Sequence, residues 1–414
     1  QKSGKTAYHL TKEKKTWKFA EDKSLPVDED RISTLLDSVA NVTATKEMEA
    51  AGDRSDYGIE NPVLTICIRT EDKTYQYKLG NEVSVEGGVY GTSSDSEKIF
   101  CMSDSLLSTF DVEANSLIQK DTIPDITEDD MTAVKIVNKK GRDFEAKAVR
   151  KSHRVESNIK WNITKPYEKP LPVSDENWST TLGYFTSLEF GELVEYGAKN
   201  PAQYGLDHPS SVITVQYKKE KKEKSFVLYV GKQKEDNYYV CLKGSSNIYL
   251  LSSGEVEQFT KLDAYDCMNK KVYNNLVTEV KGYDVIYGDT TLKVSSSLKK
   301  EKTEDSLDAS NYIWSLNGKT IPDDNVTSFV SPYSTVREIE YTGKVDKKVK
   351  PKSDEPVLKM IYHEENRDVT VTFTPYDRTN FYRVNRDGMD YFLVDKKAVD
   401  EAVKRFQSIE KMGK

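Results

Sequence analysis

Apolar residues alternate with polar ones at a spacing of two in several short segments of the chain. The segment TAVKIV at residues 132–137 leads into a turn at Gly141 and Arg142, and YDVIY at residues 283–287 leads into a turn at Gly288. Alternation at this spacing places every second side chain on one face of a strand, and turns with glycine join antiparallel neighbours. We therefore expect a meander of three antiparallel strands at each place.

Other segments carry apolar residues at spacings of three and four, which predict helices packed on a core. Two such stripes consist of Ile32, Leu35, Leu36, Val39 and Val42, and of Trp178, Leu182, Phe185 and Leu188. A third begins at Val326 and is expected to stop at Pro332, because proline lacks the amide that a helix interior needs. A last helix is expected over residues 396–411. The mixture of strands and helices predicts an α+β fold.

Two long stretches of the chain resemble each other. LPVDEDRISTLLDSV from Leu25 corresponds to LPVSDENWSTTLGYF from Leu171. Further matches follow, and the last three, Tyr90 with Tyr239, IFCM from Ile99 with IYLL from Ile248, and Phe110 with Phe259, keep one constant offset. A weaker third copy follows Trp314. The sequence thus predicts a tandem repeat of three units, each an antiparallel sheet with helices on one face, over residues 1–127, 128–273 and 274–414. The leading strand of the first unit is expected upstream of Gln1.

One short motif occurs in both clear copies, as DYGIENP at residues 56–62 and QYGLDHP at residues 203–209. We interpret it as a structural corner, since glycine accepts a positive φ and proline sets the entry to the next strand. The tyrosine would cover the edge of the core, and the acid would accept hydrogen bonds from nearby amides. The residues assigned to the corners are Tyr57, Gly58, Pro62, Tyr204, Gly205, Asp207 and Pro209.

The composition narrows the function classes. A chain of 414 residues exceeds one usual core, so two or three domains are expected. The net charge of −7 argues against a nucleic-acid partner, and the Lys-rich runs at residues 218–224 and 344–352 are typical of solvated loops. The longest apolar runs are shorter than the stretch of about 18 residues that a membrane-spanning helix needs.

No motif in the sequence carries a known chemistry. It contains neither a Gly-rich phosphate loop, nor a nucleophile elbow, nor a paired-histidine zinc motif. His208 stands beside Asp207 but has Asn61 as its counterpart in the first copy, which favours a turn residue over a general base. The acidic run at residues 125–130 lacks the spacing of a calcium loop. We therefore predict no catalytic, cofactor-binding or metal-binding residue, no cofactor, and no enzymatic activity.

The four cysteines are far apart in the sequence, without the paired spacing that metal sites use. Cys67, Cys101 and Cys241 each lie in an apolar segment that is predicted to be a strand, whereas Cys267 does not. We expect buried free thiols rather than disulfides or metal ligands.

The succession of Trp, Pro, helix, YGLD-x-P, VLYVG, YYV and IYLL resembles the bacterial family known as domain of unknown function 4340. The resemblance covers residues 17–110 and 161–259, and the third copy departs from it by lacking Tyr-Gly. Members of that family follow an N-terminal membrane helix or lipid anchor, face outward, and are often encoded near ABC-type transporters. The resemblance implies an extracytoplasmic, membrane-anchored protein whose anchor has been removed, as the start at Gln1 without methionine also suggests. The family has no established catalytic residues.

Three functions compete at this point. The first, which we favour, is a non-catalytic accessory or scaffold protein at the cell surface whose partner is a membrane protein or envelope complex such as an ABC-type transporter. The alternative is a solute- or glycan-binding protein with a site between repeats, which a pocket lined by aromatic residues at a junction would favour. The third is a hydrolase with an unconventional site, which would need carboxylates converging in a cleft.

Overall fold

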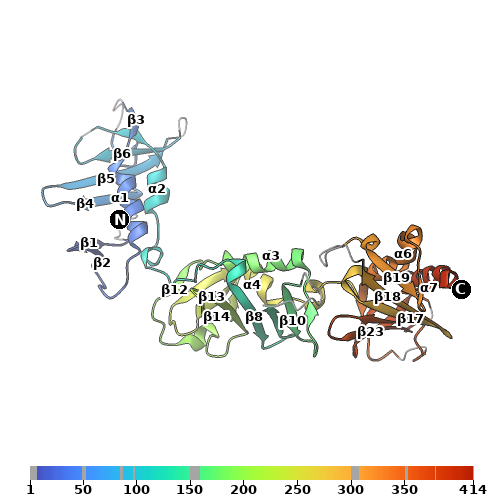
Figure 1. Cartoon of the computed structure of the whole chain (residues 1–414). Coiled ribbons are helices and arrows are strands. Elements are labelled where there is room, and N and C mark those ends of the chain that lie inside the picture. Colours follow the sequence, from blue (N-terminus) through green and yellow to red (C-terminus); the bar gives the residue numbers. More distant parts are fainter. Residues whose placement is uncertain are drawn as a thin grey trace.

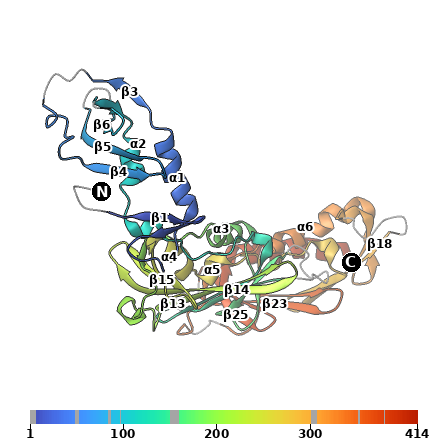
Figure 2. The same cartoon turned by 90° about the vertical axis from the view of Figure 1, so that its left-hand side faces the viewer.

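The computed structural model describes residues 7–48, 53–83, 87–96, 98–149, 159–299, 307–349, 353–377 and 379–413. Within them the chain forms an α+β fold with seven α-helices and four antiparallel sheets. Three parts follow one another along the molecule (Figure 1), and we call them the N-terminal part (residues 10–117), the central part (residues 131–267) and the C-terminal part (residues 282–410). The N-terminal part turns away from the line of the other two (Figures 1 and 2).

The central part contains a nine-stranded sheet with the order β11-β10-β9-β8-β13-β14-β15-β16-β12. Its strands are β8 (Met131–Asn138), β9 (Phe144–Ala148), β10 (Trp161–Lys165), β11 (Leu171–Pro172), β12 (Leu193–Glu195), β13 (Ser211–Lys219), β14 (Lys222–Lys234), β15 (Asn237–Leu242) and β16 (Ile248–Ser252). Helices α3 (Asp175–Thr186), α4 (Ser253–Thr260) and α5 (Ala264–Cys267) complete this part. Alternate residues of β13, such as Ile213 and Val215, are buried, as the spacing of two requires.

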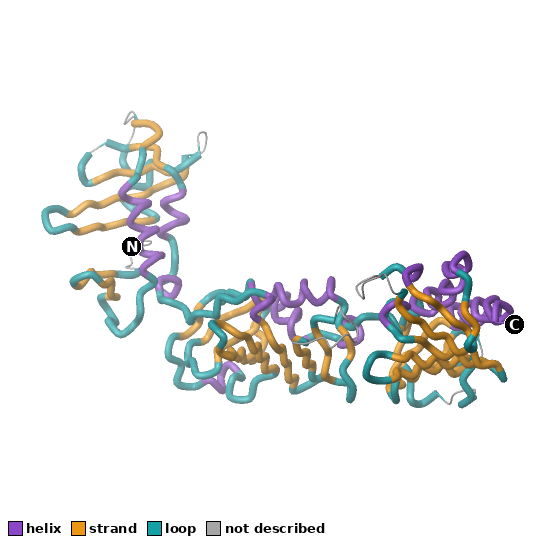
Figure 3. Tube along the Cα trace, in the orientation of Figure 1, coloured by secondary structure: helices purple, strands orange, loops and turns teal. Residues whose placement is uncertain are grey.

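The C-terminal part contains a second nine-stranded sheet, with the order β20-β19-β18-β17-β22-β23-β24-β25-β21. Its strands are β17 (Gly282–Tyr287), β18 (Thr290–Leu298), β19 (Tyr312–Leu316), β20 (Lys319–Thr320), β21 (Tyr341–Lys344), β22 (Leu358–His363), β23 (Asp368–Pro375), β24 (Phe381–Arg386) and β25 (Met389–Asp395). Its helices are α6 (Val326–Arg337) and α7 (Lys396–Glu410). Position by position, this strand order is that of the central sheet, and in both parts the helices lie mainly along one face of the sheet (Figure 3).

The N-terminal part has a five-stranded sheet with the order β3-β7-β6-β5-β4 and a separate hairpin β1-β2. Its elements are β1 (Leu10–Glu13), β2 (Thr16–Phe19), α1 (Glu29–Ala40), β3 (Ala44–Glu47), β4 (Leu64–Arg69), β5 (Thr74–Glu82), β6 (Val89–Ser93), β7 (Phe100–Met102) and α2 (Ser105–Phe110). The five strands follow the order of β12-β16-β15-β14-β13. In the central sheet β8 lies between β9 and β13, and no strand of the described residues takes that place between β1 and β4.

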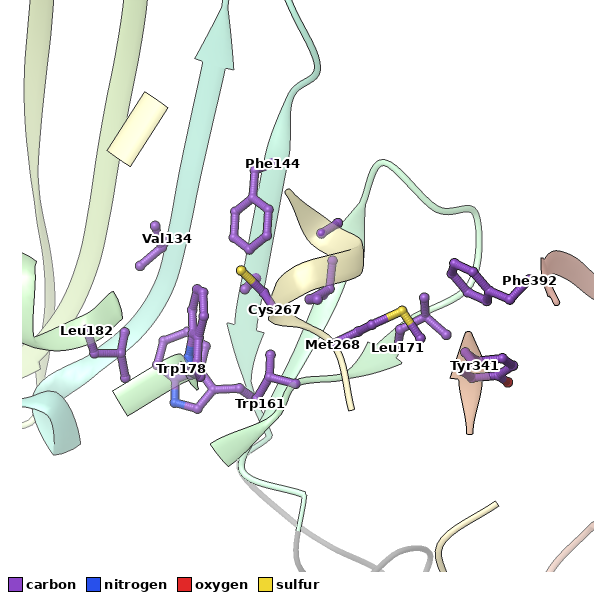
Figure 4. Close-up of a cluster of buried hydrophobic side chains, with 14 of the residues drawn as sticks. Val134, Phe144, Trp161, Leu171, Trp178, Leu182, Cys267, Met268, Tyr341 and Phe392 are labelled. Carbon is purple, nitrogen blue, oxygen red and sulfur yellow. The ribbon is translucent and has the colours of Figure 1, made fainter. Parts of the chain in front are cut away.

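One large hydrophobic core runs through the central and C-terminal parts and reaches Phe19 and Leu117 of the N-terminal part. In the central part Trp178 of α3 packs on the strands, with its ring centroid 5.5 Å from that of Trp161 and 5.6 Å from that of Phe144 (Figure 4). A second, smaller core under the five-stranded sheet contains Leu64 and Leu79. The N-terminal sheet therefore has a core of its own, whereas the other two sheets share one.

The expectation that Pro332 would end its helix is wrong. Helix α6 continues to Arg337 with Pro332 inside. Proline in a helix interior costs about 3 kcal/mol. Burial on both sides of the proline offsets this cost: Phe329 is fully buried, and so is Tyr333, whose hydroxyl donates to the carbonyl oxygen of Asn275 at 3.1 Å.

All four cysteines are free thiols, but the expectation that Cys67 is buried is wrong. On β4, Leu64 and Ile66 face the core, so Cys67, one residue further along, faces solvent. Cys101, Cys241 and Cys267 are buried as expected.

Candidate functional site

The two Tyr-Gly corners place glycine where the backbone requires it. Gly58 has a φ of 73° and Gly205 a φ of 72°, in the left-handed region that other residues avoid. There is also little room for a side chain at either position. A Cβ atom on Gly58 would lie 2.8 Å from the backbone nitrogen of Asn81, and one on Gly205 would lie 2.8 Å from Cγ of Lys232. This is the geometry that the corner interpretation requires.

Each corner tyrosine packs on a second tyrosine of its own sheet. The ring centroids lie 5.0 Å apart for Tyr57 and Tyr90, and 4.8 Å apart for Tyr204 and Tyr239. The Tyr204 hydroxyl also donates to the carboxylate of Glu195 at 2.6 Å, and this hydrogen bond, with burial, raises the pKa of Tyr204 to about 12. The corner tyrosines therefore cover the end of each sheet, and Tyr204 stays protonated.

A second glycine, which the sequence interpretation did not assign to the corners, lies opposite each of them. A Cβ atom on Gly80 would lie 2.2 Å from the carbonyl oxygen of Tyr57, and one on Gly231 would lie 2.2 Å from that of Tyr204. Both glycines fall at register shifts, between β5 and β6 and between β14 and β15. Such β-bulges turn the strand locally. The pair β23 and β24 has no such shift, and the C-terminal part has no Tyr-Gly motif.

The acids of the motif do not take the role expected of them. Within the described part of the chain no backbone amide donates to Asp207 or Glu60, and the nearest partner of Asp207 is His208 at 4.0 Å. The residues that follow the second glycines hold the corners instead. Lys232 Nζ donates to the carbonyl oxygens of Ala202 and Gln203, at 3.2 and 3.1 Å. A long amine reaches these carbonyls, whereas an acid in the turn faces solvent.

In the first corner the matching contact comes from Asn81, whose Nδ2 donates to the carbonyl oxygen of Asp56 at 3.1 Å. Pro62 and Pro209 each stand two residues before a strand, β4 or β13, as the entry role requires. The corner residues thus contact backbone and one another. The same part of the chain that shows them contains no group of three or more His, Cys, Asp or Glu side chains placed to hold a metal ion.

A cavity lies where the central and C-terminal parts meet. It has a volume of about 550 Å³. The turn between β8 and β9 and the loop after β10 form one wall, and β21, β24, β25 and their loops form the other. Segments more than 200 residues apart in the sequence therefore share it, as the contact of Tyr167 with Tyr391 illustrates.

Aromatic rings from both walls line this junction cavity. The ring centroid of Tyr167 lies 5.2 Å from that of Tyr391 and 5.3 Å from that of Phe392. Tyr376 lies on the wall formed by the C-terminal part. Its hydroxyl accepts a hydrogen bond from the amide of Asp346 at 3.1 Å, which holds the loop after β21. Burial, and secondarily the charge of Asp263, raises the pKa of Tyr167 to about 12, so its hydroxyl remains a donor.

Cationic side chains surround the rings. Arg142, Lys344, Lys347 and Arg383 line the cavity, against the single carboxylate of Asp390. Lys344 is paired with Asp263, outside the lining, at 2.7 Å. Arg383 is 3.9 Å from Asp390 and 4.0 Å from Asp354, too far for a close hydrogen-bonded pair.

The other two cations, Arg142 and Lys347, are exposed, and neither forms an ion pair with another described residue. With Asp263 counted as well, cations outnumber carboxylates around the cavity. The arrangement can bind an anion. It lacks the converging carboxylates that glycoside hydrolysis uses.

This cavity is the site that the sequence interpretation did not find. Its aromatic and basic residues are scattered over three regions of the chain, and no local motif joins them. None of the corner residues named above lines it.

None of the helices in the described ranges has both the length and the apolar character to cross a membrane. No curated protein and no solved structure matches the chain. A family model with the description "Domain of unknown function (DUF4340)" matches twice, over residues 17–160 and 161–349, and so covers well over half of the sequence. The chain belongs to this family of domains of unknown function.

Proposed function

We propose that this chain is a non-catalytic accessory or scaffold protein, held at the outer side of a cell membrane by an anchor and working with an ABC-type transporter or another envelope complex. The observation that carries the proposal is the serial arrangement of three folded parts joined by packed junctions (Figure 1). A series of this kind presents a long surface to partners, as repeat proteins do.

The first junction is held by one acidic residue of the connecting segment. The Asp121 carboxylate accepts hydrogen bonds from Ser245 at 2.5 Å and from Asn247 at 3.0 Å, and its amide donates to the Tyr249 hydroxyl at 2.7 Å. Lys120 Nζ also donates to the carbonyl oxygen of Phe190 at 2.8 Å. Contacts of both backbone and side chain thus fasten the connecting segment to the central part.

The second junction is apolar at its centre and ionic at its edge. The rings of Tyr265 and Phe392 lie 5.6 Å apart, and the Tyr265 hydroxyl donates to the carbonyl oxygen of Tyr341 at 3.0 Å. The pair of Lys344 and Asp263 adds a charged contact across the same interface. Leu171 and Met268 reach the same place from the central part (Figure 4).

The proposal includes a tandem repeat of three units. The equivalent strand orders of the two nine-stranded sheets support it, and so does the twofold match of the family model. Helices α1, α3 and α6 each have 12 residues and precede the equivalent strands β3, β12 and β21. On this view the first unit differs from the other two in that none of its described residues forms a strand in the place of β8.

Cross-linking in membranes tests the scaffold function. Membranes of cells that express the complete gene are treated with an amine-reactive reagent, and the linked peptides are identified by mass spectrometry. We expect recurrent links between this protein and one integral membrane protein, lost when detergent disperses the complex before treatment. Recovery of the protein in the soluble cytoplasm, or links no more frequent than those of an unrelated surface lipoprotein, would contradict the proposal.

A second candidate function has its own observation. The junction cavity, with Tyr167, Tyr391 and four cations, favours a binding protein with a solute or glycan site between parts. This candidate is compatible with the first, since a scaffold at the cell surface can carry a ligand site.

A further inference from the structure

We infer that the junction cavity binds an anionic saccharide, a sugar or polyol chain that carries carboxylate or phosphate groups. The inference rests on the second candidate function and names the class of its ligand. It depends on three features of the cavity: the sign of its charge, the rings on its wall, and its position across two parts of the molecule.

The charge selects for an anion. Arg142, Lys347 and Arg383 face the cavity without a close carboxylate partner, although the protein as a whole has a net charge of −7. Arginine presents planar donors that match carboxylate and phosphate oxygens in pairs. A cavity whose lining has four cations and one carboxylate attracts anions, even in a protein that is acidic as a whole.

The rings select for a flat or ring-shaped body rather than a small inorganic ion. Tyr167 and Tyr391 are half-buried, so part of each ring stays open to the cavity, and Phe392 closes the wall behind them. Aromatic faces give contact area at little cost in side-chain entropy, and tyrosine adds a hydroxyl donor. A volume of about 550 Å³ is in the range of cavities that hold a ligand of one to three rings.

The position links the ligand to the shape of the molecule. Arg142 and Tyr167 belong to the central part, and Arg383 and Tyr391 belong to the C-terminal part. A ligand that contacts both walls binds one relative placement of the two parts in preference to others. Binding therefore stabilises the junction, and the protein with ligand melts at a higher temperature.

The test is calorimetric titration of the whole chain with four probes: a trigalacturonate, a short poly(glycerol phosphate), maltotriose as the neutral saccharide, and inorganic phosphate. We expect binding of one of the first two, which distinguishes a carboxylate source from a phosphate source. Binding should weaken in high salt, because the charges are exposed and screened. Maltotriose and phosphate should bind at least about tenfold more weakly.

Two variants locate the site. Arg142→Ala combined with Lys347→Ala should weaken binding about tenfold or more, since two charge-assisted contacts are lost. Lys221→Ala combined with Lys222→Ala removes the same charge at the exposed tip between β13 and β14 and should leave binding unchanged. Tyr391→Ala should weaken the binding of every saccharide that the native protein binds.

The outcomes separate the ligand class from the site. If maltotriose binds as well as the charged probes and Tyr391→Ala abolishes its binding, the site stands and the anionic class is wrong. If the charged probes bind to the double variant Arg142→Ala, Lys347→Ala as tightly as to the native protein, they bind elsewhere and the inference is overturned. If no probe binds at millimolar concentration, the inference is overturned and the scaffold function remains with its own test.

Discussion

Gly205 shows how one residue can be determined by two separate constraints. Its φ of 72° excludes most side chains, and Lys232 leaves no room for a Cβ atom. At Gly231, across the turn, the carbonyl oxygen of Tyr204 leaves no room for any side chain. The corner is therefore a close approach of two backbones, at a bulge that re-aims the strand. Its two glycines are needed for shape.

Replacement of Gly205 by Val is predicted to lower the free energy of unfolding by about 1–3 kcal/mol, the usual range for strain at such a position. Asp207→Asn should cost less, because no backbone hydrogen bond depends on the Asp207 carboxylate within the described residues. Gly183→Ala is the matched control: Gly183 lies in α3 with nothing within 4 Å of the added Cβ. There alanine should stabilise by about 0.5–1 kcal/mol. Chemical denaturation measures all three, and an unchanged Gly205→Val protein would contradict the corner.

His363 should make stability depend on pH. It is half-buried on β22, with Nδ1 2.9 Å from Asp368 and Nε2 3.4 Å from Asp284. Burial lowers the pKa of His363, but the hydrogen bonds to the two carboxylates outweigh it and raise the pKa above its ordinary value of 6.5. A raised pKa in the folded state stabilises the protein below pH 6.5, and this contribution is lost as the pH rises through the folded pKa.

The measurement compares the native chain with His363→Gln by urea denaturation at about pH 5.5 and about pH 8.5. The substitution should cost more stability at the lower pH, where the native side chain is charged in both states and gains its partners on folding. An equal cost at both pH values would show that the two carboxylates do not hold the proton.

At the scale of elements, periodicity predicted much of the fold. The stripe from Ile32 belongs to α1 as far as Val39, with Val42 beyond the helix, and that from Trp178 belongs to α3 as far as Phe185, with Leu188 beyond the helix. The last helix ends within a residue of its expected limit. The meanders of β8 to β10 and β17 to β19 also lie where alternation placed them. Local spacing suffices in these cases because one face of each element is buried.

Other features depend on contacts that local patterns do not contain. Helix α6 passes through Pro332 because tertiary packing outweighs a local preference. Asn81 and Lys232 hold the corners, and their only signal was a polar residue directly after Gly80 and Gly231. The junction cavity depends on how two parts of the chain pack. The sequence showed the Lys-rich run at residues 344–352, of which Lys344 and Lys347 line the cavity, but no local pattern showed which residues lie opposite them.

Helix α3 supports the central sheet through one large side chain. Trp178 is 2% exposed and packs between Trp161 and Phe144, yet its indole Nε1 has no hydrogen-bond partner among the described residues. Trp178→Ala should therefore lower the free energy of unfolding by about 3–5 kcal/mol, the cost of a large cavity. Trp178→Phe should cost clearly less, since it keeps a ring and loses no hydrogen bond. Thermal or urea denaturation measures both variants. If Trp178→Phe lost as much stability as Trp178→Ala, the packing of the ring would not be the contribution of Trp178.

At the scale of the whole molecule, the two junctions differ in kind. Asp121 fastens the first through hydrogen bonds to Ser245 and Asn247, and the N-terminal sheet keeps a separate core. The second is part of a continuous core through Phe392 and Tyr341. The central and C-terminal parts thus form one packed body, and the N-terminal part extends from it.

The location that we propose for this protein is extracytoplasmic, and Cys67 allows the location to be measured directly. Its thiol is exposed, whereas Cys101, Cys241 and Cys267 are buried, and burial raises the pKa of the Cys241 and Cys267 thiols to about 11. A maleimide that cannot cross membranes will therefore report on Cys67 alone, and Cys67→Ser is the control for background.

The measurement is maleimide labelling of protoplasts from cells that express the complete gene, compared with labelling after lysis. We predict that Cys67 is labelled as fully in intact protoplasts as in lysed ones, that the labelled protein sediments with the membrane, and that Cys67→Ser is not labelled. Labelling that occurs only after lysis would place the chain inside the cell and contradict the account.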